Sequence, residues 1–130
     1  MPIFATREMK EVKGSIQKFE KLSINDEFLI DVFETEISIN PQYLSEYKTI
    51  LSYMNLYADG VHLPISKFRE LKGGKGGIKE YEFKSKQLRV YVCSIPGGKL
   101  VVMGGYKKTQ KDDINRLRIL IKGYIAFAKL

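Results

Sequence analysis

The stretch KEYEFKSKQLRVYVCSIPGGKLVVMGG, residues 79–105, decides the fold. It contains three strand-like runs, KEYEFK (79–84), QLRVYVCSI (87–95) and KLVVM (99–103). The first two runs alternate apolar and polar residues, which is typical of strands with one buried face. The links Ser85-Lys86 and Pro96-Gly97-Gly98 are short enough to be hairpin turns. We therefore predict a three-stranded antiparallel meander over residues 79–105.

The alternation also assigns side chains to the two faces of the meander, because successive residues of a strand point in opposite directions. The expected core face is formed by Tyr81, Phe83, Leu88 and Val90. Glu82 and Lys84 then lie together on the other face, and the short turn places Arg89 opposite one of them.

The third run leads into the junction MGGYKKTQKDD, residues 103–113. A plain turn needs a glycine or an asparagine, and it does not need Tyr106 between Gly105 and Lys107. Asp112 and Asp113 favour the start of a helix through its dipole. The helix has an apolar stripe of Ile114, Leu117, Ile121 and Ile125. We predict a C-terminal helix and a junction that contributes to a binding site.

Upstream of the meander, the pattern predicts one strand and two helices. SIQKFEKLSI (15–24) alternates imperfectly, as a strand does. Asn25 or Asp26 is a candidate cap for a helix through residue 37, whose apolar positions repeat near every 3.6 residues. Asn40-Pro41 predicts the start of a second helix, which Asp59-Gly60 ends. We expect the two helices to form an antiparallel hairpin.

Length and composition indicate one ordinary domain. The 130 residues are 44% hydrophobic, enough to bury a core, and we assign 1–130 to a single domain with 1–14 as a loose N-terminal extension. The single Cys93 excludes an internal disulfide and fits a reducing compartment. No run approaches the length of a membrane span. We therefore expect a cytoplasmic protein that does not bind membranes.

The sequence lacks the residues that several kinds of functional site require. One His and one Cys cannot supply the soft ligands of a metal site, so we expect no metal and no cofactor. A Cys–His nucleophilic pair has only Cys93 and His62 to draw on. The glycine-rich LKGGKGG (71–77) is not a phosphate-binding Walker loop, because no Gly-Lys-Ser/Thr precedes a helix.

Charge divides the chain into two unlike halves. Residues 1–60 carry 6 Lys and Arg against 10 Asp and Glu, whereas residues 61–130 carry 16 against 5. Between residues 67 and 111 there are 12 cations against 3 acids, with tyrosines among them. Phosphates held by Lys and Arg, with bases stacked on aromatic rings, are typical of single-stranded RNA binding. The second half therefore predicts an RNA partner, although a solvated basic surface has the same composition.

Four short motifs in order carry a resemblance to a known family. They are Leu71-Lys72-Gly73, Tyr81-Glu82-Phe83-Lys84, Leu88-Arg89-Val90 and Gly105-Tyr106-Lys107-Lys108-Thr109. This set resembles the RelE/HigB superfamily of toxins from bacterial type II toxin–antitoxin systems, including its phage-derived HigB-like branch. The match covers about residues 61–128. Lys84 stands where the family pattern has arginine, and the C-terminal part has no histidine.

The resemblance implies an α+β fold in which two N-terminal helices pack on a small, mainly antiparallel sheet, with a C-terminal helix. It implies metal-independent cleavage of mRNA, usually on the ribosome, and a cognate antitoxin as partner. By resemblance, Arg89 stabilises phosphate, Lys84 and Lys72 contact phosphate with one aiding proton transfer, and Tyr106 orients a base. The RNA backbone would be held by Lys75, Lys107, Lys108 and Lys111.

Two other functions remain open at this stage. One is a module of the same fold that binds RNA or a protein without cutting. The other is a basic DNA-binding accessory protein, although the sequence shows no evident recognition helix.

Overall fold

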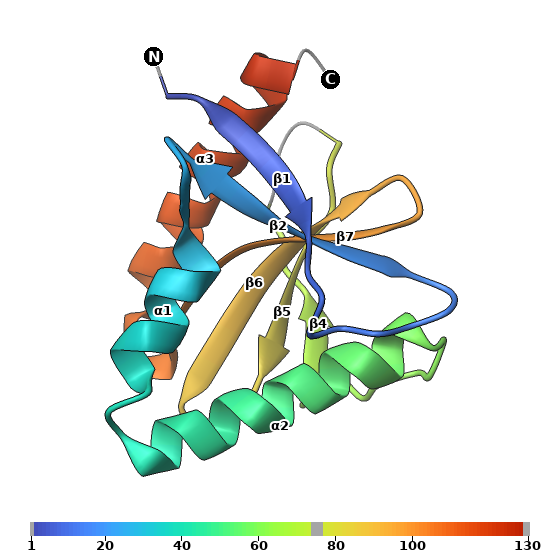
Figure 1. Cartoon of the computed structure of the whole chain (residues 1–130), viewed down its shortest axis with the longest axis vertical. Coiled ribbons are helices and arrows are strands. Elements are labelled where there is room, and N and C mark those ends of the chain that lie inside the picture. The colour runs from blue at the N-terminus through green and yellow to red at the C-terminus, as the bar shows by residue number, and fades with distance from the viewer. Residues whose placement is uncertain (1, 74–76, 129–130) are drawn as a thin grey trace.

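A mixed β-sheet lies at the centre of the computed structural model, which describes residues 2–73 and 77–128 (Figure 1). The elements are β1 (Phe4–Glu8), β2 (Lys18–Ile24), β3 (Glu27–Phe28), α1 (Leu29–Ile37), α2 (Pro41–Ala58), β4 (Phe68–Glu70), β5 (Glu80–Lys84), β6 (Leu88–Ile95), β7 (Gly98–Tyr106), the 3-10 helix η1 (Lys107–Thr109) and α3 (Gln110–Ala128). Helices α1 and α2 cover one face of the sheet, and α3 packs on the other.

The predicted meander is confirmed as β5, β6 and β7. The sheet runs β1-β2-β7-β6-β5-β4, with the short β3 paired to β2. Neighbouring strands are antiparallel except for β2 and β7, which pair in parallel. Lys84 lies opposite Arg89, and Arg89 lies opposite Gly105, so these three residues share one end and one face.

The two faces of the sheet bury two separate apolar clusters. Phe83, Leu88 and Val90 are fully buried beneath α1 and α2, which confirms the predicted core face. Tyr91 and Leu117 belong to the second cluster, under α3. The predicted polar face of the meander is thus itself largely covered by a helix, and β6 is buried on both sides.

The predicted helix at 26–37 begins later, at Leu29, and the predicted cap is wrong. Asn25 and Asp26 both have positive φ, 51° and 67°, and form the turn between β2 and β3. Two-residue hairpin turns require positive φ at both positions, which Asn and Asp tolerate. Phe28 precedes the helix without a side-chain hydrogen bond.

The second helix follows its sequence signals. The Asn40 side chain accepts a hydrogen bond from the Tyr43 backbone N–H at 3.1 Å, and Gly60 has a φ of +86° just past the end. The expected antiparallel hairpin with α1 is not formed. Figure 1 shows α1 and α2 meeting at a corner instead of running side by side. Both helices instead bury their apolar faces against the same face of the sheet.

Residues 4–12 are not part of a loose extension, which corrects the prediction for residues 1–14 over this range. β1 pairs along its length with β2, and Met9 and Val12 are buried in the core. The pattern of residues did not predict β1. Only Phe4 of its five residues, FATRE, is buried, so the strand shows no alternation of apolar and polar residues.

The α+β class is confirmed, but the helices are not N-terminal. Strands β1, β2 and β3 all precede α1, and the parallel pairing of β2 with β7 makes the sheet mixed. That pairing brings the start of the chain against the strand that ends at Tyr106.

We expect Gly98→Ala to destabilise the fold by about 1–3 kcal/mol, the usual cost of overpacking. A Cβ at Gly98 would overlap the carbonyl oxygen of Lys18 and push β2 away from β7. Urea unfolding of the variant measures the loss, with Ser94→Ala on the neighbouring strand as the control. Equal stability of Gly98→Ala and wild type would show that this contact is not tight in solution.

Candidate nucleic-acid interface

A buried carboxylate organises the end of the sheet where the predicted site lies. The Glu82 side chain is fully buried. Its Oε2 accepts from Arg69 Nε at 2.9 Å and Nη2 at 2.5 Å, and its Oε1 accepts from Gln110 Nε2 at 2.7 Å. Arg89 Nε is 3.8 Å from Oε1. One carboxylate therefore links β4, β5, β6 and the first residue of α3.

Arg89 is held within the sheet end and leaves little of its side chain exposed. It is 5% exposed, and its Nη1 donates to the carbonyl oxygens of Ser85 and Leu88, both at 2.8 Å. Its Nε is buried without a hydrogen-bond partner. The guanidinium is fixed in position, and its role towards phosphate stays a prediction.

Lys84 lies among other cations. Partial burial lowers the pKa of its ammonium, the nearby Arg69, Arg89 and Lys107 lower it further, and Glu82 alone opposes them. We call Arg69, Lys84, Arg89 and Lys107 the basic cluster. Positive groups from β4, β5, β6 and η1 thus converge, and such a cluster favours a bound anion.

Tyr106 is not brought together with the basic cluster. It follows Gly105 in β7, so the alternation of the strand directs its ring to the face that α1 and α2 cover. The ring centroid is 5.5 Å from those of Phe33 and Tyr43. Its hydroxyl donates to Glu36 Oε2 at 2.9 Å, and burial together with Glu36 raises the pKa of the phenol to about 12.

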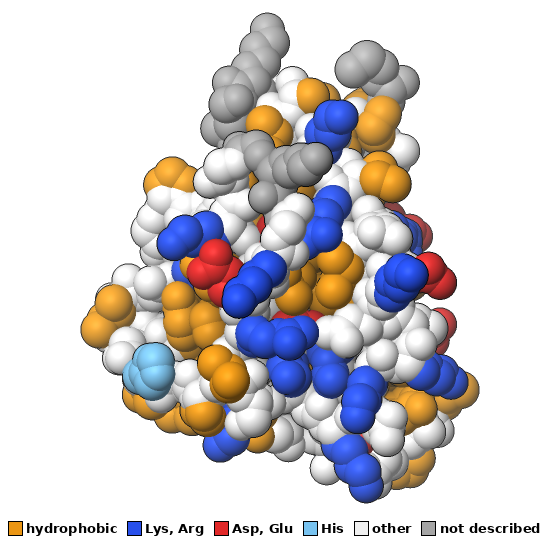
Figure 2. All heavy atoms as spheres, turned by 180° about the vertical axis from the view of Figure 1, so that it is seen from behind, with side chains coloured by type: hydrophobic (Ala, Val, Ile, Leu, Met, Phe, Trp, Pro, Cys, Tyr) orange, Lys and Arg blue, Asp and Glu red, His pale blue; other side chains and the backbone are white. Residues whose placement is uncertain are grey.

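The remaining predicted lysines lie at the surface. Lys72, Lys108 and Lys111 are exposed, as is Lys107 of the basic cluster. Lys108 Nζ is 5.8 Å from the centre of the Tyr106 ring. Lys75 lies outside the described residues. Figure 2, the view from behind the sheet, shows lysine and arginine side chains gathered across this face around a hydrophobic patch.

Sequence reasoning missed Arg69 and Arg118. Arg69 lies opposite Glu82 in the register of β4 and β5, but β4 has only three residues and no recognisable alternation. Arg118 reaches from α3 to Glu80 Oε1 at 3.1 Å, a contact between segments far apart in the sequence. Neither partner could be read from local spacing.

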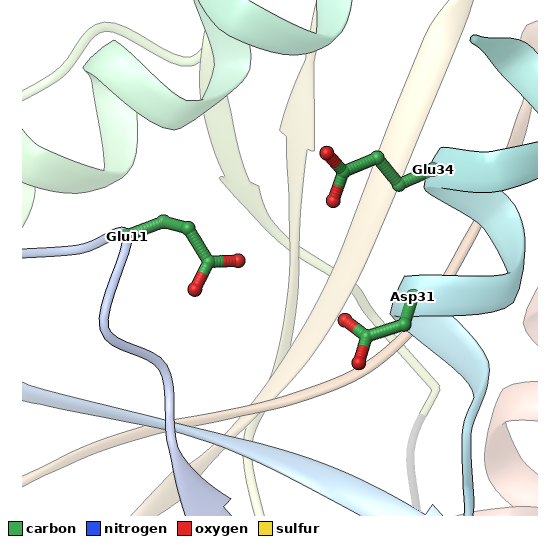
Figure 3. A group of neighbouring side chains, drawn as sticks. All are labelled: Glu11, Asp31 and Glu34. Carbon is green, nitrogen blue, oxygen red and sulfur yellow. The ribbon is translucent and has the colours of Figure 1, made fainter.

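The structure also brings three carboxylates together beside α1. Oxygens of Glu11, Asp31 and Glu34 lie within 4.8 Å of one another (Figure 3). Lys21 Nζ pairs with Asp31 at 2.8 Å and supplies a positive charge to the group. Burial, then the neighbouring Glu11 and Asp31, raise the pKa of Glu34. The group is a place of electrostatic repulsion that one lysine partly relieves.

The Cys93 thiol is buried in the sheet, and burial raises its pKa to about 12, so it stays protonated near neutral pH. His62 is exposed in the segment after α2. Within residues 2–73 and 77–128, no helix is both long and apolar enough to cross a membrane.

Comparison of the chain with protein-family models, curated proteins and solved structures gave no match. The family resemblance therefore rests on the sequence motifs alone.

We expect Glu82→Gln to destabilise the protein by about 3 kcal/mol, because breaking a buried ion pair leaves an uncompensated charge. The buried charge left without its carboxylate would be that of Arg89, because Arg69 is partly exposed to solvent. Urea unfolding checks the loss, with the exposed Glu8→Gln as the control. A stability equal to that of wild type would refute the organising role of Glu82.

We expect Glu34→Gln to raise the melting temperature at pH 7. The folded-state pKa of Glu34 lies above its unfolded value of about 4.3, so its ionisation destabilises the fold as pH rises through that window. Below pH 4 the carboxyl is protonated in both states, and the advantage of the variant should shrink. Thermal melts of the variant and of wild type at pH 7 and below pH 4 measure the difference. An unchanged or lower melting temperature of the variant at pH 7 would contradict the prediction.

Proposed function

We propose that this protein is an endoribonuclease that cleaves mRNA without a metal ion, as the toxin of a type II toxin–antitoxin system. The observation that carries the proposal is the basic cluster, in which four cations from β4, β5, β6 and η1 converge. Burial and the three neighbouring cations Arg69, Arg89 and Lys107 lower the pKa of Lys84. Such a cluster is suited to a phosphodiester, whose charge grows in the transition state.

The reaction is attack of a ribose 2′-hydroxyl on the adjacent phosphorus, with departure of the 5′-oxygen. Products are a 2′,3′-cyclic phosphate and a 5′-hydroxyl, so the proton lost by the nucleophile is balanced by one given to the leaving group. A base is needed that is unprotonated near neutral pH. Lys84 is the group whose pKa is shifted in that direction, and we assign it the role of base.

The other cations would hold the phosphate and stabilise its charge. Arg69 and Arg89 are fixed by Glu82 and by backbone carbonyls, so they would lose little freedom on binding. Lys107 is an exposed member of the same cluster, and the exposed Lys72, Lys108 and Lys111 would contact other phosphates of the RNA.

Two parts of the proposal rest on the sequence resemblance alone. These are action on ribosome-bound mRNA and neutralisation by a cognate antitoxin. A RelE-like arrangement of the fold also rests on the resemblance. In this chain β1, β2 and β3 precede α1, whereas the family's helices are N-terminal.

A second candidate function is RNA binding without cleavage. It is favoured by the position of Tyr106, which packs on the face opposite the basic cluster with its hydroxyl bound to Glu36. It is also favoured by the enclosure of Arg89, which is 5% exposed.

We expect Lys84→Arg to lower the rate of cleavage of a short RNA by about 100-fold, because arginine keeps the charge but cannot act as base. Binding of the same RNA with 2′-O-methyl groups, which lack the nucleophile, should be nearly unchanged. Lys86→Arg, at the exposed turn two residues away, is the matched control.

The pH dependence tests the same role. The wild-type rate should rise with pH as Lys84 loses its proton, and Lys84→Arg should lack this rise. Full activity of Lys84→Arg would reject the base assignment. Tight binding by wild type with no cleavage, also on translating ribosomes, would establish the binding module instead.

Induction in a bacterium tests the toxin role. Wild type should arrest growth and produce new mRNA 5′ ends at a fixed position within codons. Growth and mRNA 5′ ends should be measured in the same way for Arg89→Ala and Tyr106→Ala, after a melting curve has shown that each variant is folded. Normal growth with folded wild-type protein and no new ends would remove the nuclease claim.

A further inference from the structure

A hollow of about 650 Å³ opens beside the basic cluster. It lies between the segment that contains β4 and the first turns of α3. Its lining consists of Ile65, Leu71 and Ile114, together with the charged residues Arg69, Glu70, Lys72 and Arg118. The dimensions are within the range of small-molecule sites, so a group the size of a nucleobase can enter.

Apolar side chains form part of the wall of the hollow, among charged ones. Ile65 is 76% exposed, whereas Leu71 is buried and Ile114 is half-buried. Figure 2 shows hydrophobic side chains surrounded by Lys and Arg on this face. Apolar surface beside fixed cations suits a ligand that is flat and apolar in one part and anionic in another.

Two guanidinium groups border the hollow and are both held in place. Arg118 donates from Nε to Glu80 Oε1 at 3.1 Å and from Nη2 to the Lys72 carbonyl oxygen at 2.6 Å. Arg69 is fixed by its paired hydrogen bonds to Glu82. Planar guanidinium groups stack on nucleobases, and fixed ones do so with little loss of entropy.

Arg69 also joins the hollow to the basic cluster. It lines the hollow, and its charge lowers the pKa of Lys84. A base in the hollow would therefore lie next to a phosphate held by the basic cluster. In a nucleotide, a sugar joins a base to a phosphate.

Glu70 also borders the hollow, but its side chain does not share the face of Arg69. Glu70 lies opposite Tyr81 in the register of β4 and β5, so it belongs to the face that α1 and α2 cover. The side chains that face the hollow from this segment are those of Arg69 and Leu71.

We propose that this hollow seats the nucleobase of the nucleotide next to the phosphate at the basic cluster. This inference rests on the proposed RNA-binding function and adds a base site to it.

The test measures binding of a short fluorescent 2′-O-methyl oligo(A) and of an abasic oligomer with the same phosphates. Wild type should bind oligo(A) about tenfold tighter than the abasic oligomer. Ile65→Asn should weaken oligo(A) binding about tenfold and leave the abasic oligomer unchanged. Ile39→Asn, at another exposed isoleucine, between α1 and α2, is the matched control.

The outcomes separate this inference from the proposed function. Equal binding of the two oligomers, with Ile65→Asn matching Ile39→Asn, would overturn the base site and leave the phosphate site standing. No binding of either oligomer at low salt would overturn the proposed function itself.

Discussion

One buried carboxylate holds this molecule's charged end together. Glu82 lies at the centre of β5 with no exposure, which is costly for a charge unless partners replace water. Arg69 and Gln110 supply those partners, and Arg89 lies close by. Because the partners come from β4, β6 and α3, a single desolvated charge fixes how these elements meet. The cations gathered here would otherwise repel one another.

Opposite charges are separated by the sheet. The acidic group of Glu11, Asp31 and Glu34 lies beside α1, whereas the basic cluster lies at the face that α3 covers in part. This distribution follows the sequence, whose first half is acidic and whose second half is basic. A molecule with such a dipole approaches a polyanion with its basic face first, and the effect weakens with salt.

The sequence pattern predicted those features that depend on residues close together in the chain. The meander, the cap at Asn40 and the opposition of Lys84 and Arg89 follow from alternation, turn residues and short links. The pairing of β1, the contact of Arg69 with Glu82 and the hollow depend on segments far apart in the chain. The family resemblance assigns Tyr106 to the same site as Arg89, yet Tyr106 follows Gly105, the partner of Arg89, and successive residues of a strand lie on opposite faces.

The parallel pairing of β2 with β7 has a consequence for synthesis of the chain. Lys18 pairs with Gly98, so the first third of the protein cannot complete its sheet until the last strand has left the ribosome. Contacts of such long range slow folding. Strands β4, β5 and β6, which carry most of the basic cluster, emerge before β7 and before Gln110, which binds Glu82. The nascent chain therefore stays without an assembled anion site until translation is nearly finished.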